Sequence, residues 1–229
     1  MPRRYCDNAA TSWPKPEAVW QAWSDAARGC GASAGRGGYR SALAAERLRF
    51  EARSAAARLL RARPDRVSLV PSATVGLNMA IHGLVERGDH VVVTAADHNA
   101  TLRPVHALVR SGAVTCSVAG CDSAGRVEAT AILEAVRPST RWLVLSHACN
   151  VTGAVQDVRG IARALASLGP RRPGIILDAS QTAGLLPLDV EALGVDVMVF
   201  PAHKWSLGMA GVAAFVPCDR TVTVLVTAL

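Results

Sequence analysis

The sequence predicts an α/β fold, a mostly parallel sheet sandwiched by helices, and two observations support this prediction. Short apolar runs of strand length recur through the middle of the chain, and each ends in polar or glycine-containing residues. Segments of helical length lie between these runs, and such alternation favours a parallel sheet covered on both faces. With 229 residues, 50% of them hydrophobic, the chain is long enough to bury one sizeable core.

Before the first strand, the chain has a different character. Residues 1–35 carry Pro14, Pro16 and the glycine-rich stretch GCGASAGRGG, which predict an extended arm, a short helix over 17–27 and a loop. The loop contains no GK[ST] and follows no strand, so it fits neither a P-loop nor a dinucleotide fingerprint. We therefore expect an N-terminal arm and loop over 1–35 and a large domain over 36–229.

The large domain is expected to begin with one long helix over 36–63, because apolar residues recur there at spacings of four and seven. This apolar stripe consists of Tyr39, Leu43, Phe50 and Ala57. Six arginines cluster in the later part of this segment, at positions 47, 49, 53, 58, 61 and 63. A charge run of this kind is usually the solvated face of a helix. The alternative is a nucleic-acid surface, but no aromatic platform or nucleic-acid motif accompanies the arginines, so no nucleic-acid partner is expected.

The apolar runs are each expected to form a buried strand. They lie at 67–70, 90–94, 113–118, 141–146, 174–178 and 195–200. The helices between them are expected at 74–86, 101–110, 128–136 and 158–168. Because ligands bind at the carboxyl ends of the strands in open α/β sheets, the polar residues that follow each run are candidates for a site.

The composition argues against several classes of protein. No uninterrupted apolar stretch reaches the roughly eighteen residues of a membrane helix, and the first residues lack the apolar core of a signal peptide. A cytoplasmic protein without a membrane partner is expected. The six cysteines form no CxxC pair and no zinc-like spacing, so reduced thiols and no metal site are expected.

Lys204 is the most informative residue of the chain. It is one of only two lysines, the other being Lys15, against 23 arginines. Burial disfavours the charged form of a lysine, so its neutral amine becomes available to attack a carbonyl and form a Schiff base, whereas arginine stays protonated. A lysine near a strand end is by itself often structural. Asp178, however, ends an earlier apolar run, and an acidic group beside the ring nitrogen of pyridoxal phosphate keeps that nitrogen protonated.

The phosphate of such a cofactor needs an anion site, and the start of a helix provides one. Ser72, Ala73 and Thr74 follow the first strand and begin a helix, where backbone N–H groups face outward. His203 offers a second contact. An ordinary N-cap is the alternative for Ser72 and Thr74.

The ring of the cofactor has further candidate partners. Gln181 could bind the ring hydroxyl, His98 could lie flat on the ring, and Asn150 could contact the cofactor or the substrate. Taken singly, these residues have ordinary alternatives as a surface amide or a structural histidine, and Asp178 has one as a helix cap. Their occurrence together and in this order favours a site for pyridoxal 5'-phosphate.

Seven motifs of the chain resemble the class V aminotransferase and cysteine desulfurase family of fold-type I pyridoxal phosphate enzymes. They are YCDNAATSWPKPEAV at residue 5, GRGGYRSALAAERLRFEAR at 35, SATVGLN at 72, ADHNA at 96, SHACNVTGAVQDV at 146, LDASQTAGLLPLDVEALGVD at 177 and FPAHKWSLG at 200. The resemblance implies the large domain of that fold, a small-molecule amino acid substrate and a homodimer. In the desulfurase branch, it implies conversion of L-cysteine to L-alanine and transfer of the sulfur to an acceptor protein.

The resemblance also implies roles for individual residues. Lys204 would form the Schiff base with the cofactor, and His98 would stack on its ring. The pyridine nitrogen would bind Asp178, and the ring oxygen would bind Gln181. The phosphate would be held at Thr74, beside Ala73, and by His203, with Asn150 near the cofactor and the substrate.

The sequence departs from the family pattern in two ways. Pro201 stands where the family usually has a phosphate-binding serine, and Val75 and Met209 replace a glutamate and a proline. The family also continues beyond its lysine into a small domain with a substrate-binding arginine and the desulfurase cysteine, so a C-terminally truncated chain is expected. Three alternatives follow: an enzyme that is inactive alone, a non-catalytic cofactor-binding remnant or interaction protein, and an aminotransferase acting on another amino acid.

Overall fold

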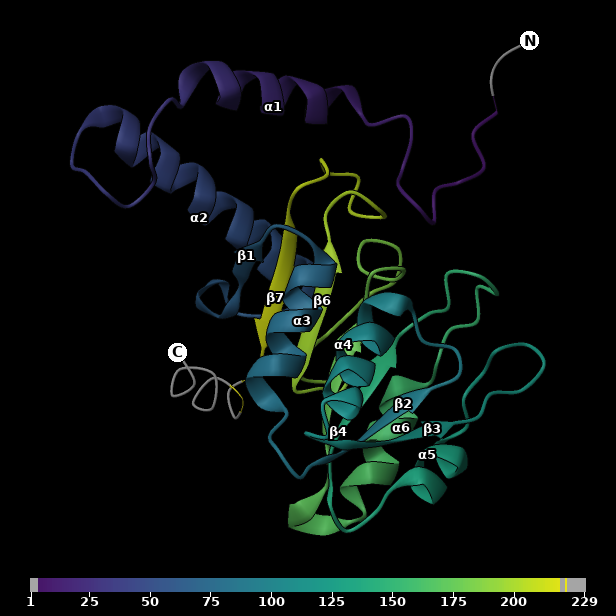
Figure 1. The fold of residues 1–229 in the computed structure, drawn as a ribbon. Coiled ribbons are helices and arrows are strands. Elements are labelled where there is room, and N and C mark those ends of the chain that lie inside the picture. Colours follow the sequence, from purple (N-terminus) through teal and green to yellow (C-terminus); the bar gives the residue numbers. More distant parts are fainter. Residues whose placement is uncertain (1–3, 219–220, 222–229) are drawn as a thin grey trace.

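The structure is a computed structural model that describes residues 4–218 and residue 221. Among these, seven strands form one sheet in the order β1-β7-β6-β5-β4-β2-β3 (Figure 1). The strands are β1 (Ser68–Val70), β2 (His90–Thr94), β3 (Thr115–Ala119), β4 (Thr140–Ser146), β5 (Gly174–Asp178), β6 (Val197–Pro201) and β7 (Ala213–Pro217). Strands β3, β2, β4, β5 and β6 run parallel, and β7 runs antiparallel to both β6 and β1. The predicted mostly parallel sheet is confirmed.

Helices cover both faces of the sheet. The helices of the described chain are α1 (Glu17–Gly29), α2 (Arg40–Leu60), α3 (Ala73–Leu84), α4 (Asn99–Arg110), α5 (Ala129–Ala135) and α6 (Val158–Ala166), with short 3-10 turns at Pro64–Arg66 and Gly169–Arg171, and all but α1 pack on the sheet. Helices α3 and α4 pack on one face, while α5, α6 and the end of α2 pack on the other. Every helix that the sequence predicts is present, with ends that differ by up to four residues.

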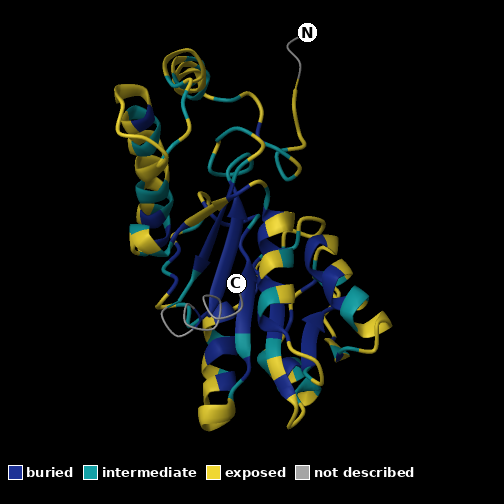
Figure 2. Cartoon of the chain, turned by 60° about the vertical axis from the view of Figure 1, so that its left-hand side comes forward, coloured by how far each residue is buried: buried dark blue, intermediate teal, exposed yellow. Residues whose placement is uncertain are grey.

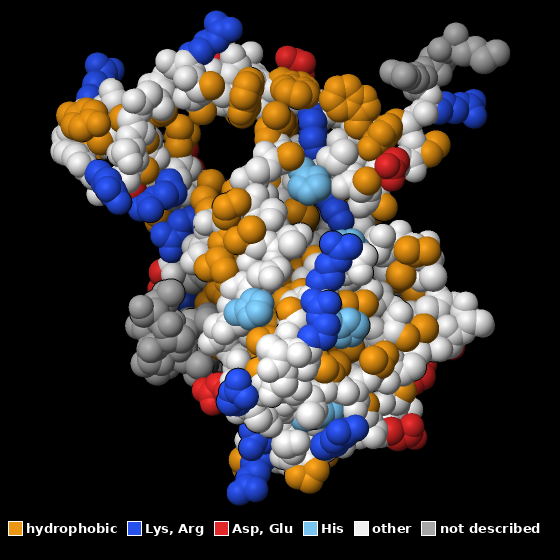
Figure 3. Space-filling model, viewed as in Figure 1, with side chains coloured by type: hydrophobic (Ala, Val, Ile, Leu, Met, Phe, Trp, Pro, Cys, Tyr) orange, Lys and Arg blue, Asp and Glu red, His pale blue; other side chains and the backbone are white. Residues whose placement is uncertain are grey.

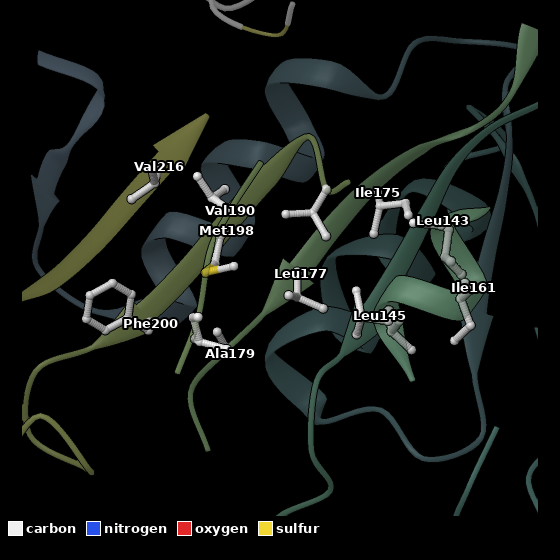
Figure 4. Close-up of a cluster of buried hydrophobic side chains, with 14 of the residues drawn as sticks. Leu143, Leu145, Ile161, Ile175, Leu177, Ala179, Val190, Met198, Phe200 and Val216 are labelled. Atoms are coloured by element: carbon white, nitrogen blue, oxygen red, sulfur yellow. The ribbon is translucent and has the colours of Figure 1, made fainter. Parts of the chain in front are cut away.

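The core lies on both faces of the central strands, because neighbouring residues of a strand point to opposite sides. In β4, Leu143 and Leu145 join the cluster that contains Ile161 of α6 (Figure 4). Val144, between them, joins the cluster that contains Leu77 of α3. Figure 2 shows these strands as the most deeply buried part of the molecule. Burial on both faces explains why the strands appear in the sequence as continuous apolar runs.

The prediction that every strand is buried is wrong for the two edges of the sheet. Strands β1 and β3 each pair on one side only, and side chains on them face solvent: Leu69 is 36% exposed and Val118 is 59% exposed. Strand β7, which lies inside the sheet between β1 and β6, was not predicted. An apolar pattern cannot separate edge strands from central ones, since strand order depends on pairing between distant segments.

The long helix is shorter than predicted and only partly packed. It begins at Arg40 rather than residue 36, and it ends where Arg61 adopts a left-handed conformation at φ 51°. Of the predicted apolar stripe, only Ala57 is buried, whereas Tyr39, Leu43 and Phe50 are 57–59% exposed. Only the C-terminal end of α2 reaches the sheet, and its first half stands away from it (Figure 1).

The six clustered arginines, four on α2 and two just after it, are largely solvated. Five of the six are exposed, and Arg53 is intermediate. Two of them pair within the helix, Arg47 with Glu51 at 2.9 Å and Arg49 with Glu46 at 2.7 Å. Such exposed pairs contribute at most about 0.5 kcal/mol each.

Helix α1 and the N-terminal arm form a layer apart from the core. No residue of α1 is buried, and hydrophobic side chains gather on the surface over this layer (Figure 3). Within the described part of the chain, no helix combines the length and apolar character needed to cross a lipid bilayer. The division of the chain at residue 35 remains a prediction.

Candidate functional site

A cavity of about 200 Å³ lies at the edge of the sheet where the parallel strands end. All eight residues predicted for the site line this cavity: Ala73, Thr74, His98, Asn150, Asp178, Gln181, His203 and Lys204. Their functional roles remain predictions. The cavity is also lined by Ser72, Ala100, Ser146, Ala148, Ser180 and Pro201. Of these, Ser146 and Ser180 were not predicted, although both stand within the motifs that supplied Asn150 and Asp178.

The register of the strands aligns the ends of β4 and β5 with each other and with β6. Ser146, the last residue of β4, lies opposite Asp178, the last residue of β5, and Asp178 lies opposite Val199 of β6. The backbone continues this alignment beyond the strands, because the N–H of His147 donates to the Asp178 carbonyl at 2.9 Å. The loops that follow these strands therefore start side by side.

Asp178 presents a buried carboxylate to the cavity. The residue is only 5% exposed, and its Oδ1 accepts the backbone N–H of Ser180 at 2.9 Å. Among the described residues, no hydrogen-bond donor reaches Oδ2, and a carboxylate oxygen in that state is free to accept a hydrogen bond from a ligand.

Lys204 lies half-buried on the loop between β6 and β7. Burial lowers the pKa of its amine, and the negative charge of Asp178 opposes part of this shift. The loop is closed by two backbone hydrogen bonds, Leu207 N–H to the Lys204 carbonyl at 3.0 Å and Gly208 N–H to the Ala202 carbonyl at 2.8 Å. A buried amine beside a carboxylate can act as a nucleophile or move a proton.

A neighbouring loop supports the lysine loop through a close backbone approach. Gly184 has φ +94°, and a Cβ at this position would lie 2.5 Å from the Trp205 carbonyl oxygen. The Ser206 hydroxyl donates to the Ala183 carbonyl at 3.3 Å. Only glycine allows both this conformation and this contact.

The start of α3 offers an anion site. Ser72 is the N-cap residue, and its Oγ accepts the backbone N–H of Val75 at 3.1 Å. The N–H groups at the start of a helix have no intrahelical acceptor, and the helix dipole makes this end positive. Ala73 and Thr74 occupy these positions and line the cavity. Burial, with the charges of Lys204 and Lys15, lowers the pKa of the nearby His203.

His98 is the N-cap residue of α4, and its ring is held by the backbone. Its Nδ1 accepts the N–H of Ala100 at 3.0 Å, so the neutral ring carries its proton on Nε2. The Thr101 hydroxyl donates to the His98 carbonyl at 2.6 Å. Asn150 is exposed on the loop after β4 and lines the same cavity.

The side chain of Gln181 is largely occupied by protein contacts. Its Nε2 donates to the Ala9 carbonyl at 2.9 Å, and its Oε1 accepts the indole N–H of Trp205 at 3.0 Å. One amide hydrogen remains for a ligand, since a glutamine amide carries two.

The N-terminal arm meets the site, a contact that was not predicted. Thr11, Ser12 and Lys15 all donate to the carbonyl oxygen of His203, the residue before Lys204. The scarcity of lysine drew attention to Lys204 and assigned no role to Lys15, and no sequence pattern identifies a backbone carbonyl as the partner of Lys15.

A sequence model of the family described as aminotransferase class-V matches residues 4–222. The chain belongs to the class V aminotransferase family. Two archaeal relatives, each described as a probable cysteine desulfurase, come from Methanothermobacter thermautotrophicus and Aeropyrum pernix. The first is 33% identical over 95% of this chain and 53% of its own length, and the second is 32% identical over 91% and 50%.

Solved structures of class V relatives share the fold. The structure of a cysteine desulfurase from Thermococcus onnurineus matches with a TM-score of 0.88 at 22% identity, over 95% of this chain and 54% of that one. The cysteine desulfurase CsdA from Escherichia coli matches with a TM-score of 0.79 at 27% identity, over 96% and 55%. The chain therefore spans about half the length of the relatives that it matches.

The cavity suits pyridoxal phosphate, the cofactor on which the class V aminotransferase family depends. It combines a helix N-terminus for a phosphate, a carboxylate with one unengaged oxygen for a ring nitrogen, and a lysine amine for an aldehyde. Among the described residues, no group of three or more His, Cys, Asp or Glu side chains could hold a metal ion.

Proposed function

We propose that this chain forms the cofactor-binding part of a pyridoxal phosphate-dependent cysteine desulfurase. One observation carries the proposal: the half-buried Lys204 amine and the buried Asp178 carboxylate line one cavity, close enough for the carboxylate charge to act on the amine. The relatives from Methanothermobacter thermautotrophicus and Aeropyrum pernix, both described as probable cysteine desulfurases, support this choice of reaction.

In this proposal, the phosphate binds at the start of α3. The backbone N–H groups of Ala73 and Thr74 receive it at the positive end of the helix, and His203 provides a second contact. Pro201 contributes no hydroxyl, so the helix end carries a larger share of phosphate binding here than in relatives with a serine at that position.

His98 would stack on the ring of the cofactor. When bound, pyridoxal phosphate supplies an electron sink for the electron pair released at the α-carbon of an amino acid. Asp178 would accept the ring N–H with its unengaged Oδ2 and keep that nitrogen protonated. Gln181 would donate its remaining amide hydrogen to the ring oxygen, and Asn150, which lines the same cavity, would contact the cofactor or the substrate.

Lys204 has two tasks in this proposal. Its neutral amine, favoured by burial, would attach to the aldehyde of the cofactor. Lys204 Nζ would also accept the α-proton of the substrate and return it.

The proposal extends to partners. We assign L-cysteine as the substrate, a homodimer as the working form and a protein as the sulfur acceptor, and all three assignments rest on the resemblance to cysteine desulfurases. The matched relatives are about twice as long as this chain, and we propose that their unmatched half contributes further parts of the reaction.

A product assay tests the proposal. The protein is given pyridoxal phosphate, L-cysteine and a thiol reductant that releases transferred sulfur as sulfide, once as this chain alone and once joined to the unmatched half of a relative. Cofactor binding is expected in both proteins, and equal amounts of alanine and sulfide are expected in the joined protein. A keto acid and pyridoxamine phosphate formed from another amino acid would favour an aminotransferase, and cofactor binding without turnover of any amino acid in the joined protein would favour a non-catalytic role. Absence of cofactor binding would overturn the proposal.

A further inference from the structure

Lys15, the second of the two lysines in the chain, lies at the same site as Lys204. Its Nζ is 2.7 Å from the carbonyl oxygen of His203 and 2.6 Å from Oγ of Ser12. His203 immediately precedes Lys204, so the ammonium of one lysine binds the peptide group that leads into the other. The two lysines are 189 positions apart in the sequence (204 − 15).

Other donors of the arm converge on the same carbonyl oxygen. The backbone N–H of Ser12 lies 3.0 Å from it, the Ser12 hydroxyl 3.1 Å and the Thr11 hydroxyl 3.0 Å. A carbonyl oxygen has two lone pairs, so these donors exceed what is needed to satisfy it. The bond from Lys15 is charge-assisted and is the shortest of the set, which makes it the strongest single contact between the arm and the lysine loop.

This contact constrains the backbone of Lys204. The peptide bond is planar, so the direction of the His203 carbonyl fixes the direction of the Lys204 N–H and Cα. Within the loop, the Gly208 N–H donates to the Ala202 carbonyl and the Leu207 N–H donates to the Lys204 carbonyl. Neither bond engages the His203 carbonyl, and in the described part of the chain all donors to that oxygen come from the arm. Lys15 itself does not line the cavity, so any effect on the chemistry passes through the His203 peptide group.

We propose that Lys15 is a positioning residue for Lys204: its ammonium binds the His203 carbonyl, locks the arm onto the lysine loop and fixes the backbone from which the Lys204 amine reaches the cofactor. This inference rests on the proposed function, in which Lys204 is the attachment point of pyridoxal phosphate. The arm also contacts a second site residue, because Nε2 of Gln181 donates to the carbonyl of Ala9.

The first measurement is cofactor occupancy. Wild type, Lys15→Met and the control Arg28→Met, which removes an exposed cation from α1, are titrated with pyridoxal phosphate, treated with borohydride and analysed by peptide mass. Lys15 is the one other lysine of the sequence, and peptide mass separates a product at Lys204 from a product at Lys15 or at the N-terminus. Loss of a charge-assisted hydrogen bond predicts that Lys15→Met needs roughly tenfold more cofactor for half occupancy, with Arg28→Met unchanged. At saturation, the dichroism of the bound cofactor changes in Lys15→Met only.

The second measurement uses the cofactor-free protein. The Ser12 amide donates to the His203 carbonyl, so its hydrogen exchange reports whether the arm is locked. Exchange in the peptide containing Ser12 is expected to be roughly tenfold faster in Lys15→Met, because removing the ammonium loosens the arm. Thermal unfolding of the same samples verifies that each variant is folded.

Faster exchange together with weaker occupancy supports the positioning role. Unchanged occupancy and dichroism in folded Lys15→Met would overturn it, whatever the exchange rate. Weaker occupancy with unchanged Ser12 exchange would also overturn it, since the effect would not pass through the arm. If wild type is never trapped at Lys204, the proposed function itself fails, a result distinct from trapping that is equal in wild type and Lys15→Met.

Discussion

The carboxylate of Asp97 ties the end of β4 to the loop after β2, because its Oδ1 accepts the backbone N–H of Ser146 at 2.6 Å. Its Oδ2 accepts the N–H of Thr94 at 2.7 Å. Ser146 completes the link, since its Oγ accepts the N–H of His98 at 3.3 Å. One side chain thereby holds the loop that carries His98 against two strands.

The burial of Asp97 predicts a pH dependence of stability. Burial raises the pKa of Asp97 from 3.8 to about 6, although its hydrogen bonds act in the opposite direction. Between about pH 4 and pH 6, the folded protein holds a proton that the unfolded chain has released, so the contribution of this group to the free energy of unfolding falls as pH rises. Relative to Asp97→Asn, wild type should lose up to about 3 kcal/mol from pH 4 to pH 7. Urea unfolding at several pH values measures this, and a constant difference between the two proteins would contradict it.

Replacement of Lys204 should abolish covalent cofactor attachment. Lys204→Ala removes the amine, and Lys204→Arg keeps the positive charge in a form that stays protonated. We expect both variants to lack the absorbance band and the borohydride-stable adduct of wild type. A borohydride-stable adduct on the peptide that contains position 204 in Lys204→Arg would show that the cofactor attaches to a group other than the Lys204 amine.

Removal of the Asp178 charge should make the Lys204 amine more reactive in the cofactor-free protein. The carboxylate opposes the lowering of the Lys204 pKa by burial, so Asp178→Asn should lower that pKa further and raise the neutral fraction. Competitive labelling with an amine reagent near neutral pH, read by peptide mass, should show faster labelling of Lys204. Lys15 is the internal reference, because burial alone lowers its pKa. An unchanged ratio of the two labelling rates would argue against the electrostatic pairing.

Gly76 should be intolerant of a side chain, because α3 packs closely on the sheet there. An added Cβ would lie 2.8 Å from Cγ1 of Val199 and 3.3 Å from Cγ2 of Val70. Overpacking of this kind predicts a loss of about 1–3 kcal/mol for Gly76→Ala. The control is Gly29→Ala at the end of α1, where no atom lies within 4 Å of the added Cβ, and a change within about 1 kcal/mol is expected. Urea unfolding of both variants measures these changes, and equal stabilities would show that α3 shifts to relieve the contact.

Much of the fold could be predicted because its central strands are buried on both faces. The runs at β4 and β5 have apolar centres, WLVL and IIL, and such runs separated by helical segments leave little choice of architecture. Prediction failed where position in the sheet decided the outcome. Strand β7 has the short, alanine-containing sequence AAFVP, and it is central only because β1 and β6 pair with it on either side.

Part of the candidate site could also be predicted from the sequence. Asp178 and Lys204 could be selected because each lies at or after the end of an apolar run and each has a side chain with distinctive chemistry.

The exposure of Tyr39, Leu43 and Phe50 on the long helix could not be foreseen. Periodicity shows that a helix has an apolar face but does not reveal what covers that face.

The sequence by itself determined the alternation of strands and helices and the polar residues at the strand ends, because backbone periodicity and side-chain chemistry are local properties. The tertiary structure alone decided that Thr11, Ser12 and Lys15 meet the carbonyl of His203. Every residue carries a carbonyl, so no sequence pattern marks the one that distant donors select. Only the folding of the arm onto the sheet edge brings them together.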